Sequence, residues 1–165
     1  MDGIIFCSNT GFSRRYGQAL SEKTGIPVFN LYDSQTLSQG ADVVFVGWLF
    51  GGFIQGLKEA KKRYNVRAVC AVGMSTAGVL SMEELKKKNF LTDTPLFYLQ
   101  GGFFMENLHG IHKFFLMILK HTLGKSLLKK ENPTPADKES IKMFFEGADF
   151  FNEDNLSEVV AFLKS

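Results

Sequence analysis

Short apolar runs alternate with amphipathic segments along the chain, which is the pattern of strands separated by helices. The runs expected to form strands cover residues 3–7, 27–31, 42–47, 66–72 and 96–99. The third run (DVVFVG) is nearly continuous β-branched and aromatic residues, and the fourth repeats the pattern of a buried strand. Such runs are typical of parallel strands covered on both faces, so we expect helices on both sides of the sheet.

The segments between the runs carry helix signals. Helices are expected over residues 13–23, 53–64, 81–88 and 155–163. Gly25 can terminate the first helix, Ser81 and Glu84 fit a capping box, and Asn155 can cap the last helix. Strands that alternate with helices predict a single α/β domain over residues 1–165, with a doubly wound parallel sheet between two helical layers.

Length and composition agree with one globular domain. The chain has 165 residues, of which 45% are hydrophobic and 22% are charged. Cys7 and Cys70 lie inside apolar runs and form no CxxC pair, so we expect reduced, buried thiols and neither a disulfide framework nor a zinc site. The sequence contains no apolar run of about 18 residues, and the apolar stretch near its start is too short for a signal peptide. These features predict a cytoplasmic protein.

A polar loop follows the first predicted strand and leads directly into the first helix. It consists of Ser8, Asn9, Thr10, Gly11, Phe12 and Ser13, and none of these residues is charged. Hydroxyls and backbone N–H groups at a helix N-terminus can bind a phosphate dianion without a lysine, because the helix dipole and the unpaired donors favour negative charge. The triphosphate motif GxxxxGK[ST] and the dinucleotide motif GxGxxG do not occur, so a monophosphate ligand is favoured. The alternative is a serine-rich helix cap.

This loop resembles the flavodoxin phosphate loop, [ST]xTGx[ST], and matches it at every fixed position. The resemblance implies a three-layer, five-stranded flavodoxin-like sheet in the order 2-1-3-4-5, with one bound FMN. Two further loops, each after a predicted strand, agree with it. They supply the remaining candidate cofactor-binding residues, which are Gly47, Trp48, Leu49, Phe50 and Gly51 after the third strand, and Gly73, Met74 and Ser75 after the fourth.

Trp48 is the only tryptophan in the chain. The second loop resembles the flavodoxin loop that lays an aromatic ring against the isoalloxazine, and a flat indole suits offset stacking on such a ring. The alternative is that Trp48 and Phe50 are simply core aromatics in a chain with 17 phenylalanines.

The last third of the chain resembles a narrower group. Residues 114–125 (FFLMILKHTLGK) and 149–162 (DFFNEDNLSEVVAF) are similar to the end of bacterial menaquinone-dependent protoporphyrinogen dehydrogenases, in which an apolar, basic segment follows the last strand. The resemblance implies oxidation of a planar organic substrate such as a porphyrinogen, with a quinone as acceptor. The family's Tyr/Arg-rich approach to this segment is replaced here by residues 101–106 (GGFFME), so the substrate stays open.

The segment 107–130 is both apolar and basic. It holds five lysines and no acidic residue, whereas the net charge of the whole chain is only +2. Six consecutive apolar residues at 114–119 spread around the entire circumference of a helix. This helix is either buried within the protein or a dimer, or it meets a lipophilic partner such as a quinone or a membrane surface. The histidines of the segment have no carboxylate or cysteine partner nearby, so no metal site is predicted.

These features predict an FMN-binding redox protein that is either an electron carrier with a redox partner protein or a dehydrogenase. The three loops contain no Asp or Glu, whereas electron-carrier flavodoxins are typically acidic around the flavin, so we expect a less negative flavin potential here.

The alternative is a binding module that has lost the flavin and uses its basic helix for partner or membrane contact. A nucleic-acid partner is not expected, because the lysines accompany a fully apolar helix. The oligomeric state is not predicted.

Overall fold

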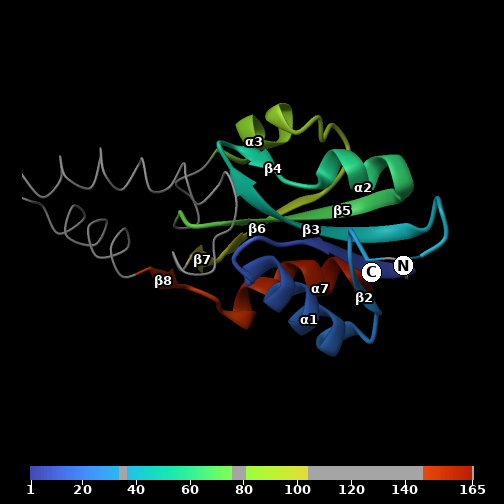
Figure 1. Ribbon diagram of the computed structural model, residues 1–165, viewed down its shortest axis with the longest axis horizontal. Coiled ribbons are helices and arrows are strands. Elements are labelled where there is room, and N and C mark those ends of the chain that lie inside the picture. Colours follow the sequence, from blue (N-terminus) through green and yellow to red (C-terminus); the bar gives the residue numbers. More distant parts are fainter. Residues whose placement is uncertain (34–36, 76–80, 104–146, 165) are drawn as a thin grey trace, which may run out of the picture.

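A parallel sheet with helices on both sides forms the body of the protein (Figure 1). The computed structural model describes residues 1–33, 37–75, 81–103 and 147–164, so the predicted helix within 107–130 and its histidines lie outside the described residues. The elements in chain order are β1 (Gly3–Cys7), α1 (Phe12–Thr24), β2 (Val28–Asn30), β3 (Asp42–Phe50), β4 (Phe53–Ile54), α2 (Leu57–Arg63), β5 (Asn65–Gly73), α3 (Met82–Lys88), β6 (Leu96–Gln100), β7 (Gly102–Phe103), β8 (Ala148–Asp149), the 3-10 helix η3 (Glu153–Leu156) and α7 (Ser157–Lys164).

The strand order of the main sheet is β2-β1-β3-β5-β6, and all neighbours along this path are parallel. The prediction of an α/β fold with a parallel sheet is therefore confirmed. The sheet has six strands rather than the five expected, because β4 adds to β3 as an antiparallel strand. Its two-residue turn consists of Gly51 and Gly52, whose φ angles of 59° and 84° are those that tight hairpins favour.

Both faces of the central strand β3 are buried. Helices α1 and α7 lie on one side of the sheet, and α2 and α3 lie on the other (Figure 1). Val43 and Phe45 belong to the apolar cluster on the α2 and α3 side, while Val44 and Val46 belong to the cluster on the α1 and α7 side. The uninterrupted apolar run of this strand is thus explained by burial on two faces.

Two predicted helix ends are confirmed. Gly25 adopts φ 73° and its N–H donates to the carbonyl of Ser21 at 2.8 Å, which closes α1. Ser81 caps α3, since its Oγ accepts the N–H of Glu84 at 3.3 Å. Both cysteines are free and buried, as expected.

Two other helix boundaries differ from the prediction. The helix expected from residue 53 begins at Leu57, because Phe53 and Ile54 pair with β3 and Gly56 then turns with φ 81°. Near the C-terminus the cap is Asn152, whose Oδ1 accepts the N–H of Asp154, and a 3-10 turn precedes the helix. An amphipathic pattern does not distinguish a short paired strand from the first turn of a helix, so these boundaries depend on tertiary contacts.

Candidate functional site

The predicted loops follow strands whose carboxyl ends lie at one edge of the sheet. Cys7 at the end of β1 is in register with Gly47 on β3, and Trp48 on β3 is in register with Val72 near the end of β5. The residues after β1, the hairpin at the end of β3 and the residues after β5 are therefore neighbours. In an open α/β sheet, ligands bind at this edge, where the strand order reverses.

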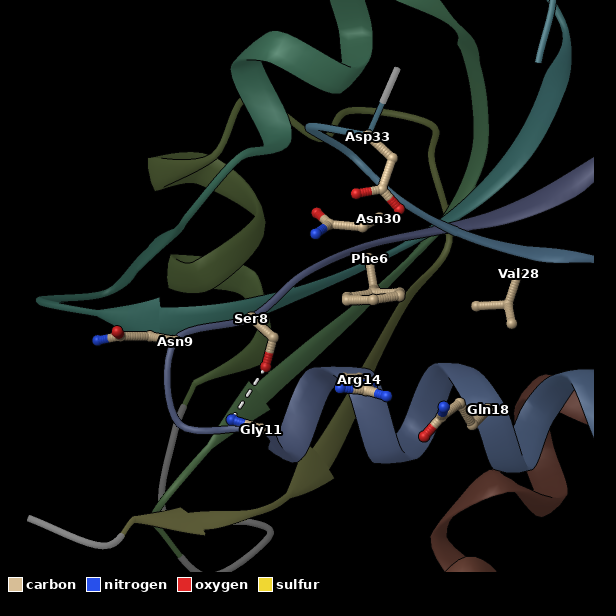
Figure 2. A pocket seen from close by; sticks show the side chains of 9 residues that line it. All are labelled: Phe6, Ser8, Asn9, Gly11, Arg14, Gln18, Val28, Asn30 and Asp33. Atoms are coloured by element: carbon tan, nitrogen blue, oxygen red, sulfur yellow. Dashed lines mark hydrogen bonds between the residues drawn. The ribbon is translucent and has the colours of Figure 1, made fainter. Parts of the chain in front are cut away.

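The turn between β1 and α1 is built around Gly11. Its φ of 97° lies in the left-handed region, and a β-carbon at this position would meet nothing within 4 Å. The Gly11 N–H donates to the Oγ of Ser8 at 3.1 Å (Figure 2). The carbonyl of Gly11 accepts the N–H of Arg15 at 2.9 Å, which starts the helix. No side chain caps this helix end, so the predicted alternative of a serine-rich side-chain cap is not what the structure contains.

Two polar atoms of this loop are buried without a partner in the described part of the chain. The Oγ of Ser13, a residue that is only 1% exposed, has no hydrogen bond there, and neither does the Nδ2 of Asn9. A buried polar group without a partner costs about 1–3 kcal/mol. Both atoms can donate a hydrogen bond, and no residue of the loop is acidic, so the residues present fit a phosphate group. Thr10 is half-buried, whereas Phe12 packs into the core on the α1 side.

An open polar cavity of about 550 Å³ adjoins this loop, and Ser8, Asn9 and Gly11 are among the residues that line it (Figure 2). It lies on the β2 side, and Trp48 does not line it. The cavity also brings in four polar side chains that the sequence analysis did not select, namely Arg14, Gln18, Asn30 and Asp33. Arg14 and Gln18 project from α1, and the other two lie across from them at the end of β2 (Figure 2). The sequence signals for these residues were an arginine directly after the loop and an aspartate two residues beyond the predicted second strand.

The segment with Trp48 is a strand and hairpin rather than the loop expected at Gly47 to Gly51. Strand β3 continues through Phe50, and Leu49 pairs with Ile54 on β4. Gly47 is required there, since a β-carbon would lie 2.6 Å from the ring of Phe45 and 2.8 Å from the backbone carbonyl of Gln55. The close approach of β4 therefore explains the extension of β3.

Trp48 and Phe50 are both half-buried, and their rings lie 5.9 Å apart at 52°. Trp48 packs against the apolar cluster on the α2 and α3 side and hydrogen-bonds with the thiol of Cys7. Burial raises the pKa of Cys7, and the hydrogen bonds with Tyr32 and Trp48 oppose this shift. Burial is the larger effect, so the thiol is protonated at neutral pH.

The third predicted loop begins at the end of β5. Gly73 is buried, and Met74 and Ser75 are half-buried; the rest of the loop, residues 76–78, lies outside the described residues. Tyr98 donates its hydroxyl to the carbonyl of Ser75 at 2.7 Å. Burial raises the pKa of Tyr98 to about 12, so the phenol stays protonated and the hydrogen bond persists at neutral pH.

Within the described ranges, no group of three or more His, Cys, Asp or Glu side chains could hold a metal ion. No helix in the same ranges has the length and apolar character needed to cross a membrane. Comparison with protein-family models and with curated proteins finds no match for this chain.

Proposed function

We propose that this chain is a flavodoxin-like, doubly wound protein that binds one FMN and takes part in redox chemistry. The observation that carries the proposal is the buried, unpartnered hydroxyl of Ser13 at the start of α1. It lies after β1, which is flanked by β2 on one side and by β3 on the other. The strand order reverses at this point, and ligands of α/β sheets bind at such reversals.

The phosphate would be held by the loop after β1. Ser13 and Asn9 offer buried donors, Thr10 offers a third, and the open N-terminus of α1 adds backbone N–H groups and its dipole. The Ser8 hydroxyl already accepts a hydrogen bond from Gly11 and can still donate its own proton. Arg14, one residue beyond the loop, would place a cation at the rim.

The isoalloxazine would lie at the same sheet edge, against Trp48. Trp48 packs against the apolar cluster on the α2 and α3 side, and the Gly51–Gly52 turn gives the hairpin a defined end. Residues Gly73 to Ser75, held by Tyr98, would form the opposite wall. FMN supplies the redox chemistry when bound, and the chain's own residues bind it, orient it and exclude water.

The charge around the ring is the property that bears on what the flavin does. None of the described residues of the three loops is acidic. Negative charge beside a flavin disfavours its anionic reduced form, so its absence raises the potential relative to acidic flavodoxins. We therefore favour oxidation of a planar organic substrate such as a porphyrinogen, with a quinone as acceptor, over low-potential electron delivery to a protein partner. Spectroelectrochemical titration tests this, and a strongly negative potential for full reduction would contradict it.

The first experiment is to identify the chromophore of the purified protein and then to titrate the flavin-free protein with FMN by fluorescence quenching. Binding of FMN together with weak binding of riboflavin, which lacks the phosphate, is the expected result. The double variant Thr10→Ala/Ser13→Ala should lose most of the preference for FMN over riboflavin. Absence of flavin absorbance together with no measurable FMN affinity would refute the proposal. Single-turnover mixing of the oxidised protein with protoporphyrinogen, and of the reduced protein with a menaquinone analogue, then separates an enzyme from a carrier.

A further inference from the structure

Two exposed phenylalanines and three lysines surround a cavity on the α2 and α3 side of the sheet. Phe90, directly after α3, is 85% exposed, and Phe53 on β4 is 53% exposed. The cavity between β4, α2 and the end of α3 has a volume of about 480 Å³ and is also lined by Lys58, Lys61 and Lys88. We call these five residues the basic aromatic face. None of the described residues that line the cavity is acidic.

The face is held rigidly by a buried asparagine. Asn89 is only 8% exposed, and its Oδ1 accepts the N–H of Ile54 at 2.7 Å. Its Nδ2 donates to the carbonyls of Gly52 and Leu85 at 2.9 and 2.8 Å. One side chain thus ties the hairpin that carries Phe53 to the helix end that carries Phe90. The backbone positions of the two phenylalanines are therefore held relative to each other rather than on independent loops.

Phe90 is held at a conformational cost. It is the one non-glycine residue of the described ranges with a positive φ, at 51°. Bulky side chains rarely adopt this region, and strain of this kind persists where the surrounding contacts enforce it. Lys61 contributes, because its Nζ donates to the carbonyl of Phe90 at 2.8 Å. The strained conformation does not bury the phenyl ring, which projects into solvent. A contribution to core packing therefore does not explain a phenylalanine at this position.

Both helices on this side of the sheet end in basic residues. The last turn of α2 carries Lys61, Lys62 and Arg63, and the last turn of α3 carries Lys86, Lys87 and Lys88. The acidic residues of both helices lie in their first turns. Lys62 is paired with Glu59 at 3.1 Å, and Arg63 donates to the carbonyl of Leu31. The cations that line the cavity beside the two rings are therefore Lys58, Lys61 and Lys88.

We propose that the basic aromatic face docks the protein on a bilayer that contains anionic phospholipid. Fixed aromatic rings enter the region between headgroups and acyl chains, and the lysines meet lipid phosphates. Diffuse positive charge around two projecting rings suits a surface whose negative charge is also diffuse and whose interior accepts apolar groups. An acidic protein partner would need an apolar pocket for each ring, placed at the spacing that Asn89 imposes. The proposal does not depend on flavin binding.

The test is flotation of the full-length protein with vesicles of phosphatidylcholine alone or mixed in equal parts with phosphatidylglycerol. We expect binding to the mixed vesicles, weak binding to phosphatidylcholine alone, and release by high salt. Phe90→Asn should weaken partition about tenfold through loss of apolar burial. Lys58→Gln/Lys88→Gln should weaken it about 25-fold, since each lysine near an anionic surface contributes a factor of about five.

A charge control is Lys164→Gln on the opposite side of the sheet, which should change partition by less than about twofold, whereas Lys58→Gln alone should weaken it about fivefold. The melting temperature of each variant shows whether it is folded. Phe90→Asn should melt at the wild-type temperature or above it, because asparagine tolerates positive φ. Equal partition of wild type, Phe90→Asn and Lys58→Gln/Lys88→Gln would overturn the proposal. Binding to polyglutamate without binding to vesicles would also overturn it and would assign the face to an acidic protein.

Discussion

Replacing Ser13 by alanine should have opposite effects on the flavin-free protein and on flavin binding. The Ser13 Oγ is buried and has no hydrogen-bond partner among the described residues, so it destabilises the unliganded fold. Removing a buried hydroxyl of this kind recovers about 1 kcal/mol of the free energy of unfolding, which raises the melting temperature by about 2–4 °C in a domain of this size. A hydrogen bond to a charged phosphate contributes about 1.5–3 kcal/mol, so the dissociation constant for FMN should rise about 10- to 150-fold.

The assay combines urea unfolding of the flavin-free protein with fluorescence titrations of FMN and riboflavin. Affinity for riboflavin should be unaffected by Ser13→Ala, because the lost interaction is with the phosphate. Ser21→Ala is the matched control on the same helix, since the Ser21 Oγ already donates to the carbonyl of Ile26 at 2.6 Å. That variant should be destabilised and should bind FMN normally. A Ser13→Ala protein that is less stable and binds FMN as tightly as wild type would refute the phosphate site.

Three further predictions concern the walls of the site. Trp48→Leu should weaken FMN binding about 3- to 10-fold and alter the visible flavin spectrum, because an aromatic stacking partner is lost. An unchanged spectrum would mean that Trp48 only packs within the protein. Gly73→Ala should lower the free energy of unfolding in urea by about 1–3 kcal/mol, because the new β-carbon would lie 2.6 Å from the Tyr98 hydroxyl. Adding Tyr98→Phe removes that hydroxyl and should recover part of the lost stability. The pKa of Tyr98 is raised from 10.0 to about 12, so between these pH values the folded state binds more protons than the unfolded state. The free energy of unfolding, measured in urea, should therefore fall as the pH rises through this window, and it should fall less in Tyr98→Phe.

The fold was predictable from local patterns because the strands that build it are buried on both faces. An uninterrupted apolar run such as that of β3 predicts a buried strand, and Gly25 predicts the end of α1. The structure has both features at these positions. The hairpin after β3 was not predictable in the same way. Phe53 and Ile54 fit an amphipathic helix as well as a strand, and the choice is made by the Gly51–Gly52 turn and by Asn89, which is distant in sequence.

The candidate site was predictable only in part, for a similar reason. The loop from Ser8 to Ser13 is contiguous, so its polar, uncharged composition could be recognised in the sequence. Arg14 and Asp33 line the adjoining cavity from two different elements, and the parallel pairing of β1 with β2 brings those elements together. Tyr98 reaches Ser75 from the neighbouring strand β6. Such contacts depend on strand register, which no local pattern specifies.

The β3–β4 hairpin belongs to both proposed surfaces, which gives them a physical connection. Trp48 lies on one strand, at the proposed flavin site, while Phe53 lies on the other strand and is part of the basic aromatic face. Phe50 and Phe53 are directly paired across the hairpin. If the face rests on a bilayer, the edge of the sheet that carries Trp48 is held close to the lipid, and a quinone dissolved there needs no transfer through water. Membrane docking would then raise the rate of flavin reoxidation by a lipophilic quinone but not by a water-soluble acceptor, and Phe90→Asn should reduce that difference in proportion to its weaker partition.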